Sequence, residues 1–192
     1  MDLDGEDPLA SAQTNLMGTI NVFDAAARLG LHRVVWASSI MVYGPRQNYT
    51  PTQLTEKAEP MPRTPYGASK LALEWLARAY RQRGLETVAL RLGTVFGPGR
   101  HRLGAAAFAV TLFEGPTAGR PVVIDEGDRT ANLLYVHDAV EACVRAALAP
   151  EPLADVYNID GFECTVADLA REVSRRLPAA DIRVTPGGES PW

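Results

Sequence analysis

Hydrophobic side chains recur at intervals of three and four near the start of the chain, at Leu9, Ala12, Leu16, Ile20, Phe23 and Ala27. This period is that of one face of an α-helix, so it predicts a helix over about residues 8–29, which Gly30 ends. Residues 33–39 follow as a short run that contains two valines and a tryptophan and does not strictly alternate. Such a run is typical of a parallel strand buried on both faces.

The same two kinds of pattern then repeat. A loop with several proline, threonine and glutamine residues occupies residues 44–65, and a second helical pattern covers about residues 66–82 before Gly84. Residues 86–91 predict the next buried strand. This order of helix, strand, helix and strand is found in doubly wound α/β sheets with right-handed crossovers. We therefore expect an α/β fold with part of a Rossmann-like parallel sheet that lacks its amino-terminal βαβ units.

After Gly97-Pro98-Gly99 the pattern loosens into shorter elements. The sequence predicts helices near residues 105–114, 138–148 and 166–177 and strands near residues 122–125, 132–136 and 156–159. Asp138 is the expected N-cap of the second helix, and Thr165 and Asp168 have the spacing of a capping box at the third. We expect residues 1–98 to be the carboxyl-terminal half of a cofactor domain that carries the catalytic residues. Residues 99–192 are expected to form an incomplete substrate-side region interleaved with the sheet.

Composition narrows the class of partner. The 192 residues are 46% hydrophobic and 22% charged, and the net charge of −4 offers no basic surface for nucleic acid or an anionic membrane. The longest strongly apolar stretch, residues 105–113, is much shorter than the roughly 20 residues of a membrane span. Cys143 and Cys164 have neither metal-ligand spacing nor a disulfide framework, so we expect reduced cysteines in a cytoplasmic protein. We expect a small-molecule partner and no metal site.

Tyr66 and Lys70 are the first candidates for chemistry. Their spacing puts both on one face of the predicted helix, about one turn apart. An isolated Tyr-x-x-x-Lys match is weak evidence, and its plain alternative is a solvated lysine beside a half-buried tyrosine. Glu74, one further turn along, is expected to be a surface partner of Lys70. Trp36 and Trp75 are expected to pack in the core.

Motifs around this pair change the interpretation. In chain order they are Asn15-Leu-Met-Gly18-Thr19-Ile-Asn21, Val34-Val-Trp-Ala-Ser-Ser39, Val42-Tyr43-Gly44, Tyr66-Gly67-Ala68-Ser69-Lys70 and Tyr157-Asn158-Ile159. In type, order and spacing they resemble the extended short-chain dehydrogenases/reductases, the NAD-dependent epimerase/dehydratase family, over nearly the whole chain. The resemblance implies a Rossmann-like fold, NAD or NADP as the cofactor, and a sugar-like substrate. It also implies a homodimer formed through the helices predicted at residues 8–29 and 66–82.

The resemblance assigns roles to individual residues. Ser39, Tyr66 and Lys70 match the catalytic serine, tyrosine and lysine, the serine being the one five residues before the glycine of Val-Tyr-Gly. The implied cofactor-binding residues are Asn15, Ser38, Tyr66, Lys70, Leu92, Gly93 and Val95. The implied substrate-binding residues are Ser39, Met41, Tyr66, Thr94 and Arg129.

Elementary electrostatics agrees with the catalytic roles. A tyrosine with a pKa of about 10 is only about one part in a thousand ionised at neutral pH, so it is a poor base by itself. A lysine cation about 4 to 5 Å away contributes roughly 3 to 4 kcal/mol at an effective dielectric near 20. Lys70 can therefore activate Tyr66 to take a proton from a substrate hydroxyl while hydride leaves for the nicotinamide. Ser39 can hold the substrate oxygen by a hydrogen bond.

Some positions depart from the family's pattern. The chain has no strand, glycine-rich turn and helix of the kind that receives a pyrophosphate, so a βαβ unit of more than about 30 residues is expected to be missing. The acidic residue that separates NAD from NADP is missing with it, and we expect the chain alone to bind cofactor weakly or not at all. Ile40-Met41 stands where sugar-nucleotide dehydratases carry a carboxylate pair. Epimerisation and simple dehydrogenation or reduction are the reactions that remain.

The expected substrate stays open between several classes. Thr94 stands where nucleotide-sugar epimerases have an asparagine, and Ala131 stands where they have an arginine. Arg129 is either a substitute clamp for a phosphate or a solvated arginine on a turn. The substrate is accordingly a nucleotide sugar or a simpler sugar acid, lactone or polyol. The alternative function is that of a nonenzymatic cofactor-binding or regulatory relative, or of an inactive fragment without the glycine loop.

Overall fold

The computed structural model describes residues 7–49, 54–100 and 107–188, which fall into two compact units. The larger unit contains the described residues of Leu3–Leu92 and His137–Ile159. The smaller unit contains those of Gly93–Val136 and Asp160–Ser190. Each unit combines helices with strands that pair in parallel, which confirms the predicted α/β class.

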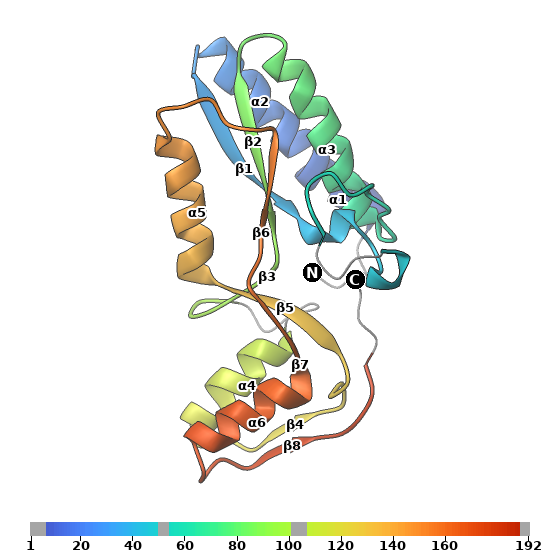
Figure 1. Ribbon diagram of the computed structural model, residues 1–192, viewed down its shortest axis with the longest axis vertical. Helices are drawn as coiled ribbons and strands as arrows, with labels where there is room; N and C mark the ends of the chain where they lie inside the picture. Colours follow the sequence, from blue (N-terminus) through green and yellow to red (C-terminus); the bar gives the residue numbers. More distant parts are fainter. Residues whose placement is uncertain (1–6, 50–53, 101–106, 189–192) are drawn as a thin grey trace. The chain divides into compact units, whose positions relative to one another are not determined.

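The larger unit is built on a parallel sheet with the strand order β1-β2-β6 (Figure 1). Its strands are β1 (Arg33–Ser39), β2 (Glu86–Leu92) and β6 (Val156–Ile159). The first two lie where buried strands were predicted, and β6 lies where a strand was predicted. Arg33 is opposite Glu86 and Ser39 is opposite Leu92, so β1 and β2 begin and end together. Their carboxyl ends lie at one edge of the sheet, which is the edge where open α/β sheets bind ligands.

Helices cover both faces of this sheet. The helices α2 (Gly18–Arg28) and α3 (Pro65–Arg81) lie side by side on one face, and α5 (Val136–Leu148) lies on the other (Figure 1). The long helix predicted near residues 66–82 is therefore confirmed as α3. Because α5 begins at Val136, Asp138 lies in its first turn, and the prediction that Asp138 is the N-cap is wrong.

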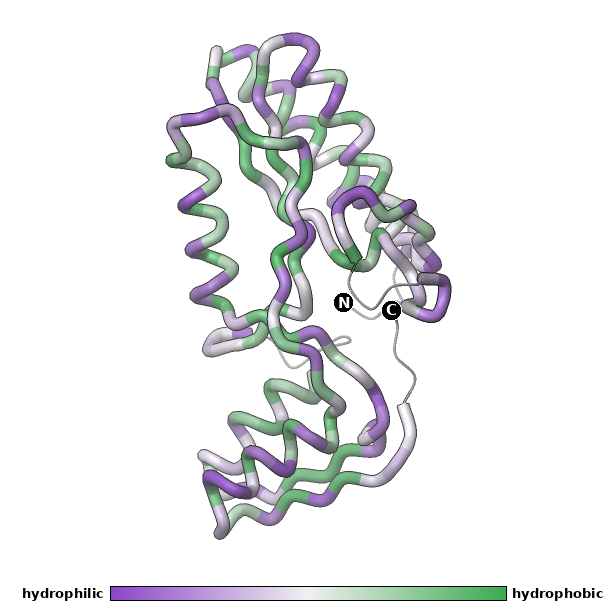
Figure 2. The backbone as a smooth tube through the Cα atoms, in the orientation of Figure 1, coloured by the Kyte–Doolittle hydropathy of each residue, from purple (hydrophilic) through white to green (hydrophobic). Residues whose placement is uncertain are grey.

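Alternation along β2 divides the core of the larger unit into two layers. Ala89 packs with Phe23 of α2 and Leu73 of α3, whereas Leu90 packs with Ala146 of α5. In Figure 2, β1 and β2 are coloured mostly as hydrophobic, while hydrophobic and hydrophilic segments alternate along α5. The strands are thus buried on two faces and the helices on one, as the two sequence patterns predicted.

The first predicted helix is not a single α-helix, and in this respect the prediction is wrong. It consists of α1 (Pro8–Ser11), a π-helical segment at Ala12–Met17, and then α2. Its start agrees with the sequence, because Oδ1 of Asp7 accepts a hydrogen bond from the N–H of Leu9 at 2.9 Å. A short π-helical segment shifts the apolar face by little, so hydrophobic spacing does not reveal it.

Trp36 and Trp75, both among the described residues of the larger unit, differ in their surroundings. Trp36 on β1 is 9% exposed and its ring meets that of Phe23 edge-on at 5.7 Å, which confirms its predicted place in the core. Trp75 on α3 is 63% exposed, so its predicted core packing is wrong. The guanidinium of Arg78 lies over its ring at 4.4 Å from the centroid. Trp75 therefore lies on the outer side of the helix, where its ring packs against the Arg78 guanidinium and not against the core.

The smaller unit contains two sheets. In the first, β3 (Thr94–Phe96), β5 (Thr130–Tyr135) and β7 (Phe162–Thr165) have the order β3-β5-β7, and β7 runs antiparallel to β5. In the second, β4 (Val122–Ile124) pairs in parallel with β8 (Ile182–Val184). Strands β4 and β5 lie near the positions predicted for them. The sequence patterns did not predict β3, β7 or β8, each of which has at most four residues.

Two helices complete the smaller unit. They are α4 (Ala107–Thr117) and α6 (Val166–Arg176), and the first two residues of the helix predicted at 105–114 lie outside the described residues. The predicted capping box of α6 is confirmed: Oγ1 of Thr165 accepts from the N–H of Asp168 at 3.0 Å, and the carboxylate accepts from the N–H of Thr165 at 3.4 Å. Across the part of the chain that the structure describes, every helix is too short or too polar to cross a membrane.

Candidate active site

Two consecutive serines lie at the carboxyl end of β1. Ser38 and Ser39 end the strand, and the 3-10 helix Ile40–Val42 follows directly. Ser39 is the N-cap of this short helix, because its Oγ accepts a hydrogen bond from the N–H of Met41 at 3.2 Å. All three side chains are at most 8% exposed. Ser39 is therefore held by the turn that it caps.

The first turn of α3 is pressed against the turn after β1. Thr64 caps α3, and its Oγ1 accepts from the N–H of Gly67 at 3.0 Å. A Cβ atom on Gly67 would lie 2.4 Å from the carbonyl O of Met41, which is closer than Cβ atoms approach other atoms. Only glycine allows the helix to come this near. Tyr66, which precedes Gly67, is thereby carried to the turn that follows Ser39.

Lys70 lies one turn further along α3, beside the ring of Tyr66. Its Nζ is 5.5 Å from the centroid of that ring and donates a hydrogen bond to the carbonyl O of Ala37 at 2.9 Å. Both side chains are half-buried, and burial lowers the pKa of Lys70. An ammonium group has three N–H donors, so Lys70 can also donate to the hydroxyls of a bound sugar or ribose. The solvated lysine of the plain alternative is therefore not what the structure shows.

Glu74 is not a surface residue, and the prediction that it pairs with Lys70 at the surface is wrong. Its side chain is 5% exposed and that of Arg91 on β2 is 4% exposed. Arg91 donates from Nε to Oε1 at 2.9 Å and from Nη2 to Oε2 at 2.6 Å, which is a bidentate ion pair. Ser38 donates to Oε1 of Glu74 at 2.6 Å. Spacing along α3 could not predict this ion pair, because its cation, Arg91, lies on another element, the buried strand β2.

The ion pair continues into a longer polar network at the carboxyl end of the sheet. Nη1 of Arg91 donates to the phenol of Tyr43, and that phenol lies 2.8 Å from Oδ1 of Asn158 on β6. Nδ2 of Asn158 donates to the carbonyl O of Leu54 at 3.1 Å. Burial raises the pKa of Tyr43, although Arg91 and Asn158 act in the opposite direction. Tyr43 therefore stays a neutral donor at physiological pH, and the network joins β1, β2, β6 and the loop before α3.

Arg91, Tyr43 and Asn158 carry no assignment from the sequence. One feature of the sequence could have indicated them. Arg91 is a cation inside a predicted buried strand, and a buried cation requires a counter-charge nearby. Strand register would then align Ser38 with Arg91 and Arg91 with Asn158. Pairing of this kind follows from three-dimensional arrangement and not from spacing along the chain.

The remaining predicted site residues are divided between the two units. Asn15 lies in the π-helical segment of the larger unit, where its Nδ2 donates to the carbonyl O of Ser11 at 3.2 Å, and Leu92 ends β2. Gly93, Thr94 and Val95 belong to the smaller unit. The larger unit thus brings together Ser38, Ser39, Met41, Tyr66 and Lys70.

Arg129 belongs to the smaller unit and is 8% exposed, so the alternative of a solvated arginine is wrong. Its Nη1 pairs with Oε2 of Glu126 at 2.5 Å, and its guanidinium lies 5.1 Å from the centroid of the Phe108 ring. A role as a phosphate clamp stays a prediction.

Candidate metal ligands do not gather within residues 7–49, 54–100 and 107–188. In those ranges there is no group of three or more histidine, cysteine, aspartate or glutamate side chains placed to hold an ion. Cys143 and Cys164 are free thiols. His101 lies outside the described residues.

Known proteins match most of this chain. The profile of the NAD dependent epimerase/dehydratase family matches residues 2–160. UDP-glucose 4-epimerase of Mycolicibacterium smegmatis is 31% identical over 180 residues, which are 92% of this chain and 56% of that protein. Mitochondrial L-threonine 3-dehydrogenase of Sus scrofa is 30% identical over 174 residues, which are 88% of this chain and 46% of that protein. This chain therefore spans about half the length of the curated relatives that it matches.

Solved structures share the fold. The holo form of a GalE-like L-threonine dehydrogenase from Cupriavidus necator has a TM-score of 0.83 and 29% identity, with 94% of this chain and 60% of that chain covered. UDP-glucose 4-epimerase of Thermus thermophilus in complex with NAD has a TM-score of 0.80 and 28% identity, with 96% and 60% covered. The range that the family profile matches contains Ser39, Tyr66 and Lys70. The chain belongs to the NAD dependent epimerase/dehydratase family.

Proposed function

We propose that the whole protein is an NAD(P)-dependent oxidoreductase or epimerase. It acts on a secondary alcohol carbon of a sugar, nucleotide sugar or sugar acid. The observation that carries the proposal is the placement of the Lys70 ammonium 5.5 Å from the centre of the Tyr66 ring, on a helix pressed against the turn after Ser39. That arrangement suits proton transfer at a hydroxyl group.

Tyr66 acts as the general base in the direction of alcohol oxidation. The Lys70 cation lies 5.5 Å from the centre of the Tyr66 ring, and a cation about 5 Å from a phenolate oxygen stabilises it by about 3 kcal/mol at an effective dielectric near 20. Lys70 thus favours the form of Tyr66 that takes the hydroxyl proton of the substrate. Ser39 donates a hydrogen bond to the same substrate oxygen. In the reverse direction Tyr66 returns the proton as an acid.

The donors of this chain fit the nicotinamide-ribose end of the cofactor. Lys70 donates one N–H to the carbonyl O of Ala37, and its other two N–H groups donate to the ribose hydroxyls. Asn15, Ser38, Leu92, Gly93 and Val95 are proposed to line the remaining cofactor surface. The nicotinamide ring, when bound, accepts or returns the hydride. Of the named relatives, the Thermus thermophilus epimerase contains NAD.

The substrate class follows from the relatives and from the turn after Ser39. Met41 and Thr94 are proposed to contact the substrate, and Arg129 is proposed to bind a phosphate if the substrate carries one. Ile40 and Met41 supply no carboxylate next to the reacting carbon, so elimination of water is not proposed. For oxidation alone, or for oxidation followed by return of hydride to the other face, this chain would supply Ser39, Tyr66 and Lys70, and the nicotinamide would take up and return the hydride.

A hydroxy amino acid is a second candidate substrate. It is supported by the similarity of this chain to the L-threonine dehydrogenases of Sus scrofa and Cupriavidus necator. Threonine carries a secondary alcohol, so the same three residues would serve its oxidation, with the hydride passing to the nicotinamide. The sugar and amino acid candidates differ in the groups around the alcohol, which the smaller unit is proposed to contact through Thr94 and Arg129.

The test is an assay of the whole protein with both cofactors. UDP-glucose conversion is followed by chromatography, because epimerisation leaves no net change in the cofactor, and L-threonine oxidation is followed by the absorbance of reduced cofactor. We expect turnover of at least one secondary alcohol from the two classes. Cofactor binding without turnover of any of them would support the nonenzymatic alternative instead.

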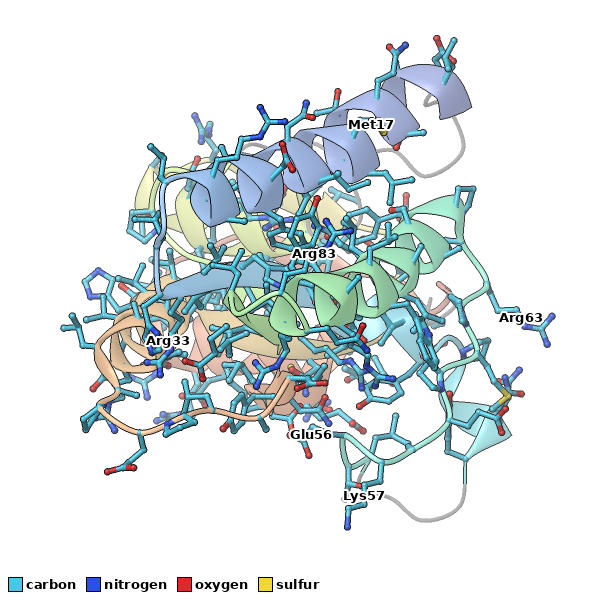
Figure 3. The ribbon with its side chains drawn as sticks, turned by 90° about the horizontal axis from the view of Figure 1, so that it is seen from above. Met17, Arg33, Glu56, Lys57, Arg63 and Arg83 are labelled. Atoms are coloured by element: carbon cyan, nitrogen blue, oxygen red, sulfur yellow. The ribbon has the colours of Figure 1, made fainter. Side chains whose placement is uncertain are left out.

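We also propose that the whole protein is a homodimer. Apolar side chains are exposed along the two helices that lie side by side on one face of the sheet, among them Val22 at 56% on α2, Trp75 at 63% and Leu76 at 40% on α3. Met17, labelled in Figure 3, is 49% exposed on the same helical layer. Burying such a surface against a second copy is favourable. Light scattering that shows only monomer at micromolar concentration would contradict this proposal.

A further inference from the structure

Three polar residues form a row across the carboxyl end of the sheet in the larger unit. Ser38 on β1 is opposite Arg91 on β2, and Arg91 is opposite Asn158 on β6. Residues directly opposite each other on neighbouring strands project to the same face. Glu74 reaches this row from α3, and Tyr43 reaches it from the turn after β1. Of these five side chains, only Ser38 has a role in the function proposed above, at the cofactor surface, and none of them transfers the proton.

Both partners of the ion pair between Arg91 and Glu74 are buried. The side chains of Glu74 and Arg91 are 5% and 4% exposed, and two hydrogen bonds of 2.9 and 2.6 Å join them. Taking two charges out of water is costly, and a buried ion pair is often no more stabilising than apolar residues of the same volume. Stability alone is therefore a weak reason for this pair to lie here.

Glu74 also fixes where α3 lies along β1. Tyr66, Lys70 and Glu74 follow one another at intervals of four on one face of the helix, about 6 Å apart along its axis. Nζ of Lys70 donates to the carbonyl O of Ala37, and Oγ of Ser38 donates to Glu74. Two successive turns of the helix thus bind two successive residues of the strand. A shift of α3 along or about its axis would break both hydrogen bonds.

We propose that Glu74, held in place by Arg91, is a positioning residue that sets the distance between the Tyr66 phenol and the Ser39 hydroxyl. The proposal rests on the function proposed above, in which both groups act on one substrate oxygen. Ser38 is covalently joined to Ser39, and Glu74 lies two turns after Tyr66 on the same helix. Displacing the Ser38–Glu74 contact therefore moves the two reacting hydroxyls relative to each other. A misplacement of about 1 Å lowers a rate about 100-fold.

The same two strands carry a second buried ion pair that serves as a matched control. Arg33 and Glu86 are opposite each other at the amino ends of β1 and β2, are 6% and 10% exposed, and lie 2.7 Å apart. In Figure 3, Arg33 lies on the opposite side of the view from Arg63, which precedes the N-cap of α3. Loss of a buried carboxylate should affect stability at either pair, but it should affect the reacting hydroxyls only at Glu74.

The test compares Glu74→Gln with Glu86→Gln in the whole protein. Both substitutions should lower the Tm, because each leaves a buried guanidinium without its counter-charge. Only Glu74→Gln should lower kcat, by about 10- to 100-fold, with KM changed by less than about 2-fold. Equal kcat values for the two variants would overturn the proposal.

A second variant covers the case in which Glu74→Gln does not fold. Ser38→Ala keeps both partners of the ion pair and removes the hydrogen bond from β1 to Glu74. We expect it to lower kcat about 10-fold with a nearly unchanged Tm. A kcat equal to that of the unmodified protein would overturn the proposal.

A spectroscopic measurement separates this proposal from the proposed function. In protein labelled with carbon-13 tyrosine, the signal of Tyr66 is identified by its loss in Tyr66→Phe. This signal should shift in Ser38→Ala and stay in place in Glu86→Gln. If the whole protein turns over no substrate, the proposed function fails, and the signal still decides: a shift in Ser38→Ala supports the positioning role, and an unshifted signal refutes it.

Discussion

Gly67 is the residue on which the close approach of α3 to the turn after β1 depends. A methyl group at this position would lie 2.4 Å from the carbonyl O of Met41. We expect Gly67→Ala to lower the free energy of unfolding by about 1 to 3 kcal/mol, as overpacking does elsewhere. It should also reduce turnover, because α3 must move away and takes Tyr66 with it. Denaturant unfolding and kcat measure the two effects.

Gly18 provides the control for this substitution. It also lies in a helix, and the nearest atom to a Cβ there, the carbonyl O of Gln13, is 3.9 Å away. Alanine has the higher helix propensity, by about 1 kcal/mol, so Gly18→Ala should leave stability unchanged or raise it. Equal behaviour of the two alanine variants would show that the contact between Gly67 and Met41 is not tight.

Ionisation of Glu86 makes the free energy of unfolding of the larger unit depend on pH. Burial alone would raise its pKa, but the N–H of Leu153 and the guanidinium of Arg33 hold the pKa below its ordinary value of 4.5. A carboxylate whose pKa is lower in the folded state contributes stability above the unfolded pKa and loses it as pH falls through the folded pKa. The difference in the free energy of unfolding between the unmodified protein and Glu86→Gln should therefore shrink as pH falls below about 4.5. Urea unfolding at several pH values measures it, and a constant difference would contradict the assignment.

At the scale of elements, hydrophobic pattern predicted the parts of the fold that bury a full face. Helix α3 was predicted from its helical period, and the strands β1 and β2 were predicted from short apolar runs without strict alternation. The strand β8 has three residues and exists through its pairing with β4, so no local pattern reveals it. Within the candidate site, Tyr66 and Lys70 follow from spacing along one helix, whereas the ion pair of Glu74 depends on strand register.

The capping box of α6 is an element that can be tested by itself. Its Thr165 hydroxyl satisfies the N–H of Asp168, one of the amides that no carbonyl within the helix reaches. We expect Thr165→Ala to lower the free energy of unfolding of the smaller unit by about 1 kcal/mol. Thr165→Ser keeps the hydroxyl and should cost much less. Hydrogen exchange at the amides of the first turn of α6 measures both variants, and equal protection in the two would contradict the cap.

At the scale of the whole molecule, the predicted catalytic residues share the larger unit, and Thr94 and Arg129 belong to the smaller one. Proton transfer by Tyr66 should therefore be separable from substrate choice. The functional division predicted between residues 1–98 and 99–192 stays a prediction. So do the roles of the individual cofactor and substrate residues.

The central claim is that Tyr66 transfers the proton, and Tyr66→Phe in the whole protein tests it most directly. The substitution removes one hydroxyl and keeps the ring, so Tm and cofactor affinity should stay close to those of the unmodified protein. We expect kcat to fall about 100- to 10,000-fold, the usual contribution of general acid–base catalysis. In the unmodified protein the rate of alcohol oxidation should rise with pH as Tyr66 loses its proton, and this rise should be absent from Tyr66→Phe. Turnover by Tyr66→Phe close to that of the unmodified protein, with the same rise with pH, would contradict the account.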